Sequence, residues 1–396
     1  KDALIANTTA TDQVAIGHEA LDAATTGSEN TAVGKSALSA LTEGVQNTAL
    51  GGYTLLADTT GSRNVSIGYQ SMIANTTGHG NVAIGQCALN ANTDQNDSVA
   101  VGHCALDANT CPNQTAVGAY ALQLNTTGTN NVAVGMGSLD ANTTGDSNVA
   151  VGGQALGANT TADGNTAVGY QSLDANTTGF NNTAVGNCSG SGVTTGDCNT
   201  YIGAFAAYTA STGNNNTAVG DQALSLMTTA SDNTAVGRSA LKITTDGTFN
   251  AAFGDLAASC NTTGDCNTAI GSTAMERVTT GSSNTAVGRL AGKGHTTGAG
   301  NTSIGFKAGC NITTGSANVV IGDSSGADGS MINLTNEDNR AVFGHNGITN
   351  AYVKVDWTVT SDERDKMNFE EVPHGLDFVN QLKPVSFVFK KSRDDA

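Results

Sequence analysis

The 17-residue stretch NTAVGYQSLDANTTGFN, Asn165–Asn181, decides the fold, because variants of it fill most of this 396-residue chain. Its first glycine, Gly169, returns every 17 residues, with one step of 16. A fixed short period indicates stacked structural repeats in which each unit contacts only its neighbours. The sequence therefore predicts a solenoid. The glycines that mark its coils, called marker glycines below, are Gly17, Gly34, Gly51, Gly68, Gly85, Gly102, Gly118, Gly135, Gly152, Gly169, Gly186, Gly203, Gly220, Gly237, Gly254, Gly271, Gly288, Gly305 and Gly322.

Each marker glycine closes a short strand-like segment such as Thr166-Ala167-Val168. Alternate residues of a strand face the same way, so Thr166 and Val168 share one side and Ala167 takes the other. An exposed side would normally be polar, and the alanine side is not, so we expect it to be covered as well as the side of Thr166 and Val168. A column of alanines invites the close approach of another backbone, which predicts that parallel solenoids associate as a homotrimer.

The rest of the repeat predicts a second strand and a turn. Ser172 and Leu173 give a second short buried segment, so we expect two strands in each coil. The turn Asn176-Thr177-Thr178-Gly179 brings a second glycine, for which we expect a positive φ angle. Some 20 coils spaced by about 4.8 Å would make a fibre of roughly 95 Å.

An asparagine stands four residues before most marker glycines. Columns of asparagine in register can hydrogen-bond along a stack. Other asparagines, among them Asn75, Asn125, Asn142 and Asn261, lie in Asn-x-Ser/Thr sequons, which indicate glycosylation in a secreted eukaryotic protein. We favour ladder or turn positions for these asparagines, because the repeat itself generates the sequons.

The composition narrows the class of protein. With 50 glycines and 5% aromatic residues, the interior must be narrow, which excludes the core of an ordinary large enzyme, and no cofactor is expected. A net charge of -17 argues against binding to nucleic acid and to anionic membrane surfaces. No apolar run is long enough for membrane insertion.

Cysteine spacing predicts disulfides in an oxidising setting in preference to a metal site. Cys87 and Cys104 both lie two residues after their marker glycines, so they should stack in adjacent coils. The Cys-x-x-Cys spacing of zinc sites is absent. The predicted pairs are Cys87 with Cys104, Cys188 with Cys198, and Cys260 with Cys266.

The succession of Asn-Thr-Ala-Val-Gly, Ala-Leu and Asn-Thr-Thr-Gly over residues 13–344 resembles the head repeats of YadA-type trimeric autotransporter adhesins and similar repeats of bacteriophage tail fibres. The resemblance implies an all-β fold, a left-handed parallel β-roll or β-solenoid of about 20 coils, with three chains side by side. It also implies a role in adhesion or spacing at a cell or virion surface.

The composition changes after about residue 350, where glycine nearly disappears and charge becomes dense. Thr360 or Ser361 can cap a helix, an amphipathic stretch spans 376–382, and 385–389 is strand-like. These features predict a short α+β segment at the carboxy-terminal end. We divide the chain into a repeat shaft at 1–350, a linker at 351–360 and the N-terminal part of a separate domain at 361–396.

This last segment also resembles the start of the intramolecular chaperone domain of phage tail fibres and tailspikes, the peptidase S74 family, whose Ser-Asp-x-Arg-x-Lys motif matches Ser361 to Lys366. The resemblance implies a Ser/Lys dyad that cuts the Thr360–Ser361 bond after the domain has assembled a trimer. Ser361 would be the nucleophile and Lys366 the base, whose pKa must then be lowered. No activity on an external substrate is expected.

Together these features predict a trimeric fibre for host-surface attachment, in a virion tail fibre or at an extracellular or cell surface, with a glycan or protein receptor. Tyr53, Tyr69, Tyr120 and Tyr170, just after marker glycines, are candidate exposed contacts. The alternative is a cellular trimeric adhesin or an extracellular glycosylated filament. A polysaccharide-degrading tailspike would need paired carboxylates, and acids such as Asp221, Asp255 and Asp323 are scattered. An ice-binding face is disfavoured, because adjacent threonines of a strand point opposite ways.

Overall fold

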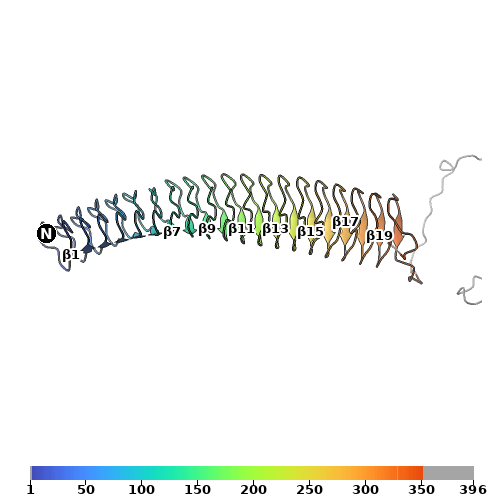
Figure 1. Ribbon diagram of the computed structural model, residues 1–396, viewed down its shortest axis with the longest axis horizontal. Coiled ribbons are helices and arrows are strands. Elements are labelled where there is room, and N and C mark those ends of the chain that lie inside the picture. The colour runs from blue at the N-terminus through green and yellow to red at the C-terminus, as the bar shows by residue number, and fades with distance from the viewer. Residues whose placement is uncertain (1, 328, 351–396) are drawn as a thin grey trace, which may run out of the picture. The chain divides into compact units, whose positions relative to one another are not determined.

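Each repeat contributes one strand of three residues that ends directly before the marker glycine. The computed structural model describes residues 2–327 and 329–350, and within them the strands stack in a single row (Figure 1). The described residues contain no helix. The strands are β1 (Val14–Ile16), β2 (Thr31–Val33), β3 (Thr48–Leu50), β4 (Val65–Ile67), β5 (Val82–Ile84), β6 (Val99–Val101), β7 (Thr115–Val117), β8 (Val132–Val134), β9 (Val149–Val151), β10 (Thr166–Val168), β11 (Thr183–Val185), β12 (Thr200–Ile202), β13 (Thr217–Val219), β14 (Thr234–Val236), β15 (Ala251–Phe253), β16 (Thr268–Ile270), β17 (Thr285–Val287), β18 (Thr302–Ile304), β19 (Val319–Ile321) and β20 (Ala341–Phe343).

The strands form one parallel sheet in which each pairs with the next along the chain. The register repeats the sequence period, so that Ala167 of β10 lies beside Ala184 of β11. The stack accommodates two steps that differ from 17 residues. Val99 pairs with Thr115 across the step of 16, and Val319 pairs with Ala341 across a step of 22. The predicted all-β parallel solenoid of about 20 coils is therefore confirmed.

The prediction of two strands in each coil is wrong. The segment after the marker glycine forms turns, because its residues alternate into the left-handed region: Gln171 has a φ of 53° and Leu173 a φ of 49°. This curl turns the Leu173 side chain into the coil, where it is fully buried. One strand and one curled segment thus enclose the core.

We inferred that the alanine side of the strand faces outward and packs against another chain, but this side faces the inside of the coil. Ala167 points into the coil and is 0% exposed, as are most of its equivalents, whereas Val168 is 36% exposed on the outside. A coil of 17 residues has room for leucine opposite alanine and for little more, so the larger β-branched residues lie outside. The alanine column therefore cannot be the surface on which another chain packs.

The two glycines of a repeat serve different needs. Gly169 has a φ of +138°, and a Cβ there would lie 2.3 Å from the carbonyl oxygen of Gly186. The second glycine, Gly179, does not adopt the positive φ that we predicted; a Cβ there would instead lie 2.3 Å from the carbonyl oxygen of Gly196. Close backbone approach between coils explains this second glycine.

Asparagine ladders hold neighbouring coils together, as predicted. The side chain of Asn165 donates to the carbonyl of Gly179 at 2.9 Å and accepts from the backbone N–H of Asn182 at 2.9 Å. A second buried column contains Asn142, whose amide donates to Asn125 Oδ1 at 2.9 Å. The side chains at all four sequon positions singled out above are 0% exposed, so they are closed to glycosylation in the folded coil. Asn75, Asn125 and Asn142 lie in this ladder, whereas Asn261 donates to the carbonyl of Gly264 in its own turn.

The chain separates into two compact units, Lys1–Ile348 and Thr349–Ala396. The first contains the solenoid. The predicted linker at 351–360, the separate domain at 361–396 and the bond between Thr360 and Ser361 lie outside the described residues, as does Lys366.

Candidate functional surfaces

An apolar stripe runs along the outside of the parallel sheet. The residue directly before each marker glycine, together with the equivalent Phe343, forms this column, which we call the outer stripe. Every one of its side chains is partly or largely exposed, and none carries a charge. The members with more than a third of their surface exposed are Ile16, Leu50, Ile84, Val117, Val134, Val168, Val185, Ile202, Phe253, Ile270, Ile304, Ile321 and Phe343.

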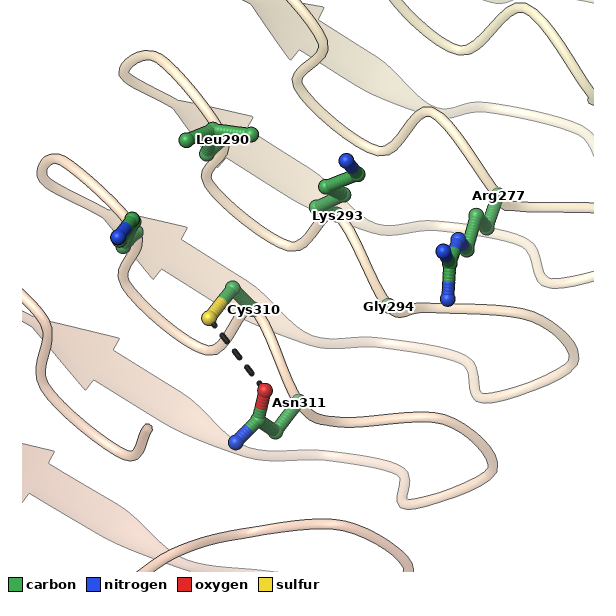
Figure 2. A pocket seen from close by; sticks show the side chains of 7 residues that line it. Arg277, Leu290, Lys293, Gly294, Cys310 and Asn311 are labelled. Carbon is green, nitrogen blue, oxygen red and sulfur yellow. Dashed lines mark hydrogen bonds between the residues drawn. The ribbon is translucent and has the colours of Figure 1, made fainter. Parts of the chain in front are cut away.

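A second surface, here called the side face, consists of residues two, five and six positions after the marker glycines. The curled segment brings these positions together on successive coils, and surface hollows form between them. Figure 2 shows one hollow, with Lys293, Arg277 and Asn311 around it from three successive coils. It has a volume of about 330 Å³ and is lined by Arg277, Leu290, Lys293, Lys307, Cys310 and Asn311.

This basic hollow was missed by the sequence analysis. The signal was available in the distribution of charge: no Lys or Arg occurs between Arg63 and Arg238, whereas residues 271–311 contain four basic residues and one acid. Lys293 Nζ forms an ion pair with that acid, Glu276, at 3.1 Å. The segment has a formal charge of +3 in a chain of net charge -17.

A second hollow, of about 360 Å³, is more apolar. Phe205 and Tyr208 meet edge to face with ring centroids 5.5 Å apart, and Leu226 and Lys242 complete the wall together with Gln222 and Ser225. Both aromatic rings are more than a third exposed. This pair of aromatic residues was also not predicted.

The tyrosines predicted as surface contacts lie close to the side face. Tyr69, Tyr120 and Tyr170 are exposed, as predicted, and Tyr53 is half-buried against Tyr69 with ring centroids 5.9 Å apart. Lys35 Nζ lies 5.0 Å from the Tyr53 ring centroid.

No disulfide links any two of the eight cysteines, all of which lie within the described residues. The thiol of Cys104 contacts that of Cys87 in the adjacent coil, and burial is the main factor that raises the pKa of Cys104. The pairing of Cys87 with Cys104, of Cys188 with Cys198 and of Cys260 with Cys266 stays a prediction.

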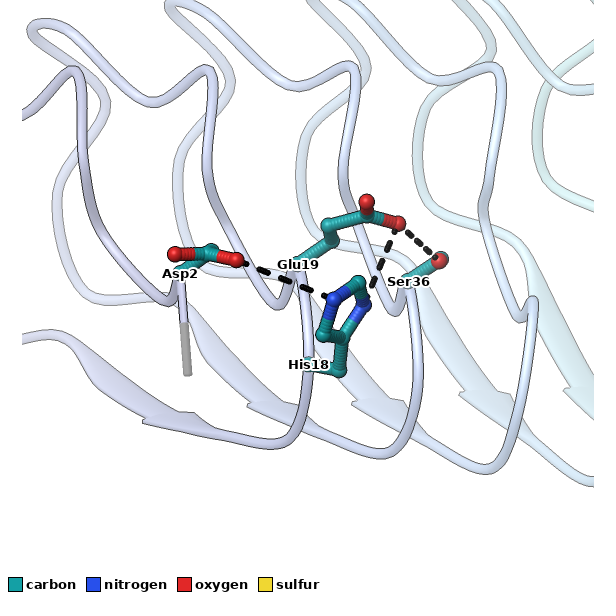
Figure 3. A network of polar contacts seen from close by, with 4 residues as sticks. All are labelled: Asp2, His18, Glu19 and Ser36. Carbon is teal, nitrogen blue, oxygen red and sulfur yellow. Dashed lines mark hydrogen bonds and ion pairs between the residues drawn. The ribbon is translucent and has the colours of Figure 1, made fainter.

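The amino-terminal coils contain a polar network that includes serine, histidine and carboxylates (Figure 3). His18 Nε2 lies 3.7 Å from Asp2 and its Nδ1 lies 3.4 Å from Glu19. The Ser36 hydroxyl donates to Glu19 at 3.1 Å. Because this hydroxyl donates to a carboxylate and not to the imidazole, the network lacks the nucleophile–base pair of a hydrolase.

The acids considered for glycan cleavage do not form a pair. Asp221 and Asp255 each follow a marker glycine and stand two coils apart, which corresponds to about 10 Å along the stack. Arg238 holds Asp255 in an ion pair of 2.8 Å. Asp323 follows Gly322, four coils beyond Asp255.

Over 2–327 and 329–350, no group of three or more His, Cys, Asp or Glu side chains is arranged to hold a metal ion. The part of the chain that the structure describes also contains no helix suited to crossing a membrane.

Comparison with models of protein families gives a match at the carboxy-terminal end. Residues 361–396 are similar to the Peptidase_S74 family, described as the chaperone of endosialidase. No curated protein matches the chain. The matched segment starts at Ser361, where the Ser-Asp-x-Arg-x-Lys motif begins. The similarity to this chaperone family implies that the chain forms trimers.

Proposed function

We propose that this chain is the shaft of a homotrimeric surface fibre in which three solenoids pack through the outer stripe, and that its carboxy-terminal chaperone assembles the trimer and is then released. The observation that carries the proposal is the outer stripe itself. The similarity of residues 361–396 to a chaperone family supports the same assembly.

The size of the outer stripe supports burial between chains. Monomeric proteins rarely expose a contiguous apolar patch larger than roughly 300–600 Å². Here an uncharged column of aliphatic and aromatic side chains accompanies 20 stacked strands, or roughly 95 Å at the spacing of parallel strands. Three such stripes facing a common axis would remove this surface from water without an unpaired charge.

The assembly is tested by light scattering on the full chain. Val185→Lys with Ile202→Lys places two charges on adjacent strands of the outer stripe, and we expect the native mass to fall from three chains to one. Thr195→Lys with Thr212→Lys adds the same charge to exposed turns of the same coils and should leave a trimer. A wild-type monomer, or a trimer in the stripe variant, would refute the packing through this stripe.

Release of the chaperone would follow from the predicted dyad. Lys366 takes the proton of the Ser361 hydroxyl, whose oxygen attacks the carbonyl carbon of Thr360. The C–N bond between Thr360 and Ser361 then breaks as Lys366 returns the proton to the Ser361 amine, which leaves an ester on the Ser361 oxygen. Water hydrolyses this ester and frees the Thr360 carboxylate and the Ser361 hydroxyl. Intact mass of the denatured protein tests this step: wild type should give a fragment that begins at Ser361, and Ser361→Ala should stay uncut. An uncut wild-type chain would rule out processing and favour a cellular adhesin.

The role we propose for the assembled fibre is attachment to a host surface, in a virion tail fibre or another extracellular filament. The linings of the two hollows contain no residue of the outer stripe, so the hollows would stay open in such a trimer, and the exposed Tyr69, Tyr120 and Tyr170 are further candidate contacts. Binding of the purified fibre to candidate host cells, with loss of infection or adhesion on addition of free fibre, tests this role.

A further inference from the structure

We propose that the basic hollow on the side face binds an acidic polysaccharide through its carboxylate or sulfate groups. The inference names the ligand class of the attachment role proposed above and rests on it. It is carried by three basic side chains, Arg277, Lys293 and Lys307, which come from three successive coils and line one hollow.

The charges around the hollow leave it open to an anion. Glu276 is the only acid between residues 271 and 311, and its carboxylate pairs with Lys293. No ion pair of Arg277 or Lys307 is found within the described residues. Lys307 Nζ lies 5.3 Å from the centroid of the Phe306 ring, which Arg289 approaches at 5.7 Å. Two cationic groups therefore line the hollow without a carboxylate partner.

The hollow has the shape for a chain-like ligand. A third hollow, different from the apolar one at Phe205, adjoins the basic hollow. It shares Lys307, Cys310 and Asn311 with the basic hollow and continues over the next coil to Ser324. The groove thus extends over four coils, or about 14 Å between the first and the last. Its repeat of about 4.8 Å is comparable with the length of one sugar ring, so successive acidic sugars can meet cations on successive coils.

Charge complementarity favours a polysaccharide over a nucleic acid. Nucleic-acid binding depends on many phosphate contacts made by extended clusters of Lys and Arg. This rod carries no basic residue over the long segment from Arg63 to Arg238 and would repel a duplex. The Asn311 amide and the Leu290 side chain in the same hollow supply the polar and apolar contacts typical of a sugar site.

The test measures binding of the full chain to immobilised heparin, which is sulfated, and polygalacturonate, which is carboxylated, with dextran as the neutral control, at physiological salt. We expect wild type to bind at least one of the two acidic polymers and to ignore dextran. Arg277→Gln with Lys307→Gln should weaken this binding at least tenfold. The matched control Lys35→Gln with Arg63→Gln removes the same charge far from the hollow and should change binding less than twofold.

Each other result counts against the proposal. Binding to neither acidic polymer, equal binding by wild type and the hollow variant, or an equal loss in the control would overturn the site, and tighter binding to duplex DNA would overturn the ligand class. Light scattering on the same samples separates this outcome from the assembly. A trimer that binds neither polymer refutes the site alone, and a monomer that binds refutes the assembly alone.

Discussion

Replacement of Asp58 by asparagine should stabilise the solenoid at pH 8 and leave its stability nearly unchanged at pH 4. Asp58 begins the second buried asparagine column, where Asn75 is the next member. Its carboxylate accepts from the backbone N–H of Gly61 at 2.7 Å and from the Asn75 amide at 3.3 Å, and the side chain is 0% exposed. The rest of the column uses neutral amides at the same position.

The magnitude follows from the pKa of this carboxyl. Burial is the main factor that raises the pKa of Asp58 from 3.8 to about 7. Because the folded state binds this proton more tightly than the unfolded state, the destabilisation is absent below about pH 4, grows from pH 4 to 7 and is constant above. The difference between the two pKa values corresponds to roughly 4 kcal/mol at pH 8. Asp58→Asn removes the charge and can donate its amide to Gly61, as the other asparagines of the column donate to equivalent carbonyls.

Denaturant unfolding at pH 4 and pH 8 checks this expectation, with hydrogen exchange over residues 41–92 to localise the gain, since a solenoid responds mainly in neighbouring coils. Asp221→Asn, at an exposed position, is the matched control for the change in net charge. A variant that is no more stable than wild type at pH 8, or one that gains equally at both pH values, would show that the buried charge is not the cause.

Four other predictions concern the asparagine ladder, the marker glycine, the buried histidine and the cysteines. Asn165→Ala should cost roughly 2–5 kcal/mol, because a buried carbonyl and a buried N–H lose their partner; Asn165→Gln in the same melts should recover part of the loss. Gly169→Ala should prevent formation of soluble rod, seen by circular dichroism, because its Cβ would meet backbone that no side-chain rotation can relieve. Burial lowers the pKa of His295 to about 4, so the contribution of His295 to stability should fall by about 3 kcal/mol from pH 6.5 to pH 4; this contribution is the difference in pH dependence between wild type and His295→Asn, and equal pH dependence of the two would contradict the assignment. Mild oxidation should link Cys87 to Cys104, as found by peptide mass, and the absence of this cross-link would remove the predicted pair.

The period, the parallel register and the asparagine ladder could be predicted because each depends only on spacing along the chain. Equivalent atoms of stacked coils must meet whatever the coil's cross-section is. The shape of the coil was harder to predict. The left-handed φ of Leu173 leaves no mark in the sequence, since leucine ordinarily avoids that region, and the segment therefore looked like a second strand.

The side face was missed for the same reason. Arg277, Lys293 and Lys307 hold different positions relative to their marker glycines, and only the curl of the turns brings them to one hollow. A sequence pattern with a period of two or 3.6 assigns faces to strands and helices, but a turn has no such period. The concentration of positive charge was visible, and its meeting point was not.

In some coils a glycine replaces a large core side chain, and a large side chain at another position fills the space. The sequence shows this compensation only once the residues that face the inside of the coil are known. Gly190 stands where most coils have leucine, and Tyr201 in the next coil occupies the space: a Cβ on Gly190 would lie 2.8 Å from the tyrosine ring. In the same way the His295 ring lies 2.8 Å from a Cβ built on Gly292. These pairs explain how a tyrosine and a histidine enter a core made mainly of alanine and leucine.

Because of the orientation of the strand, the outer stripe and not the alanine column is the surface that favours association. The outer stripe also favours association more strongly than an alanine column would. If alanine had faced outward, each isolated solenoid would have exposed only small methyl groups, and contact with another chain would have been optional. With Ala167 inside and Val168 outside, the larger apolar side chain of the strand is the one left in contact with water. Burial of apolar surface stabilises by about 25 cal/mol for each Å² removed from water, and the gain grows with every coil added. A longer shaft therefore has a greater need for its partners, which is consistent with a chaperone segment that brings the chains together.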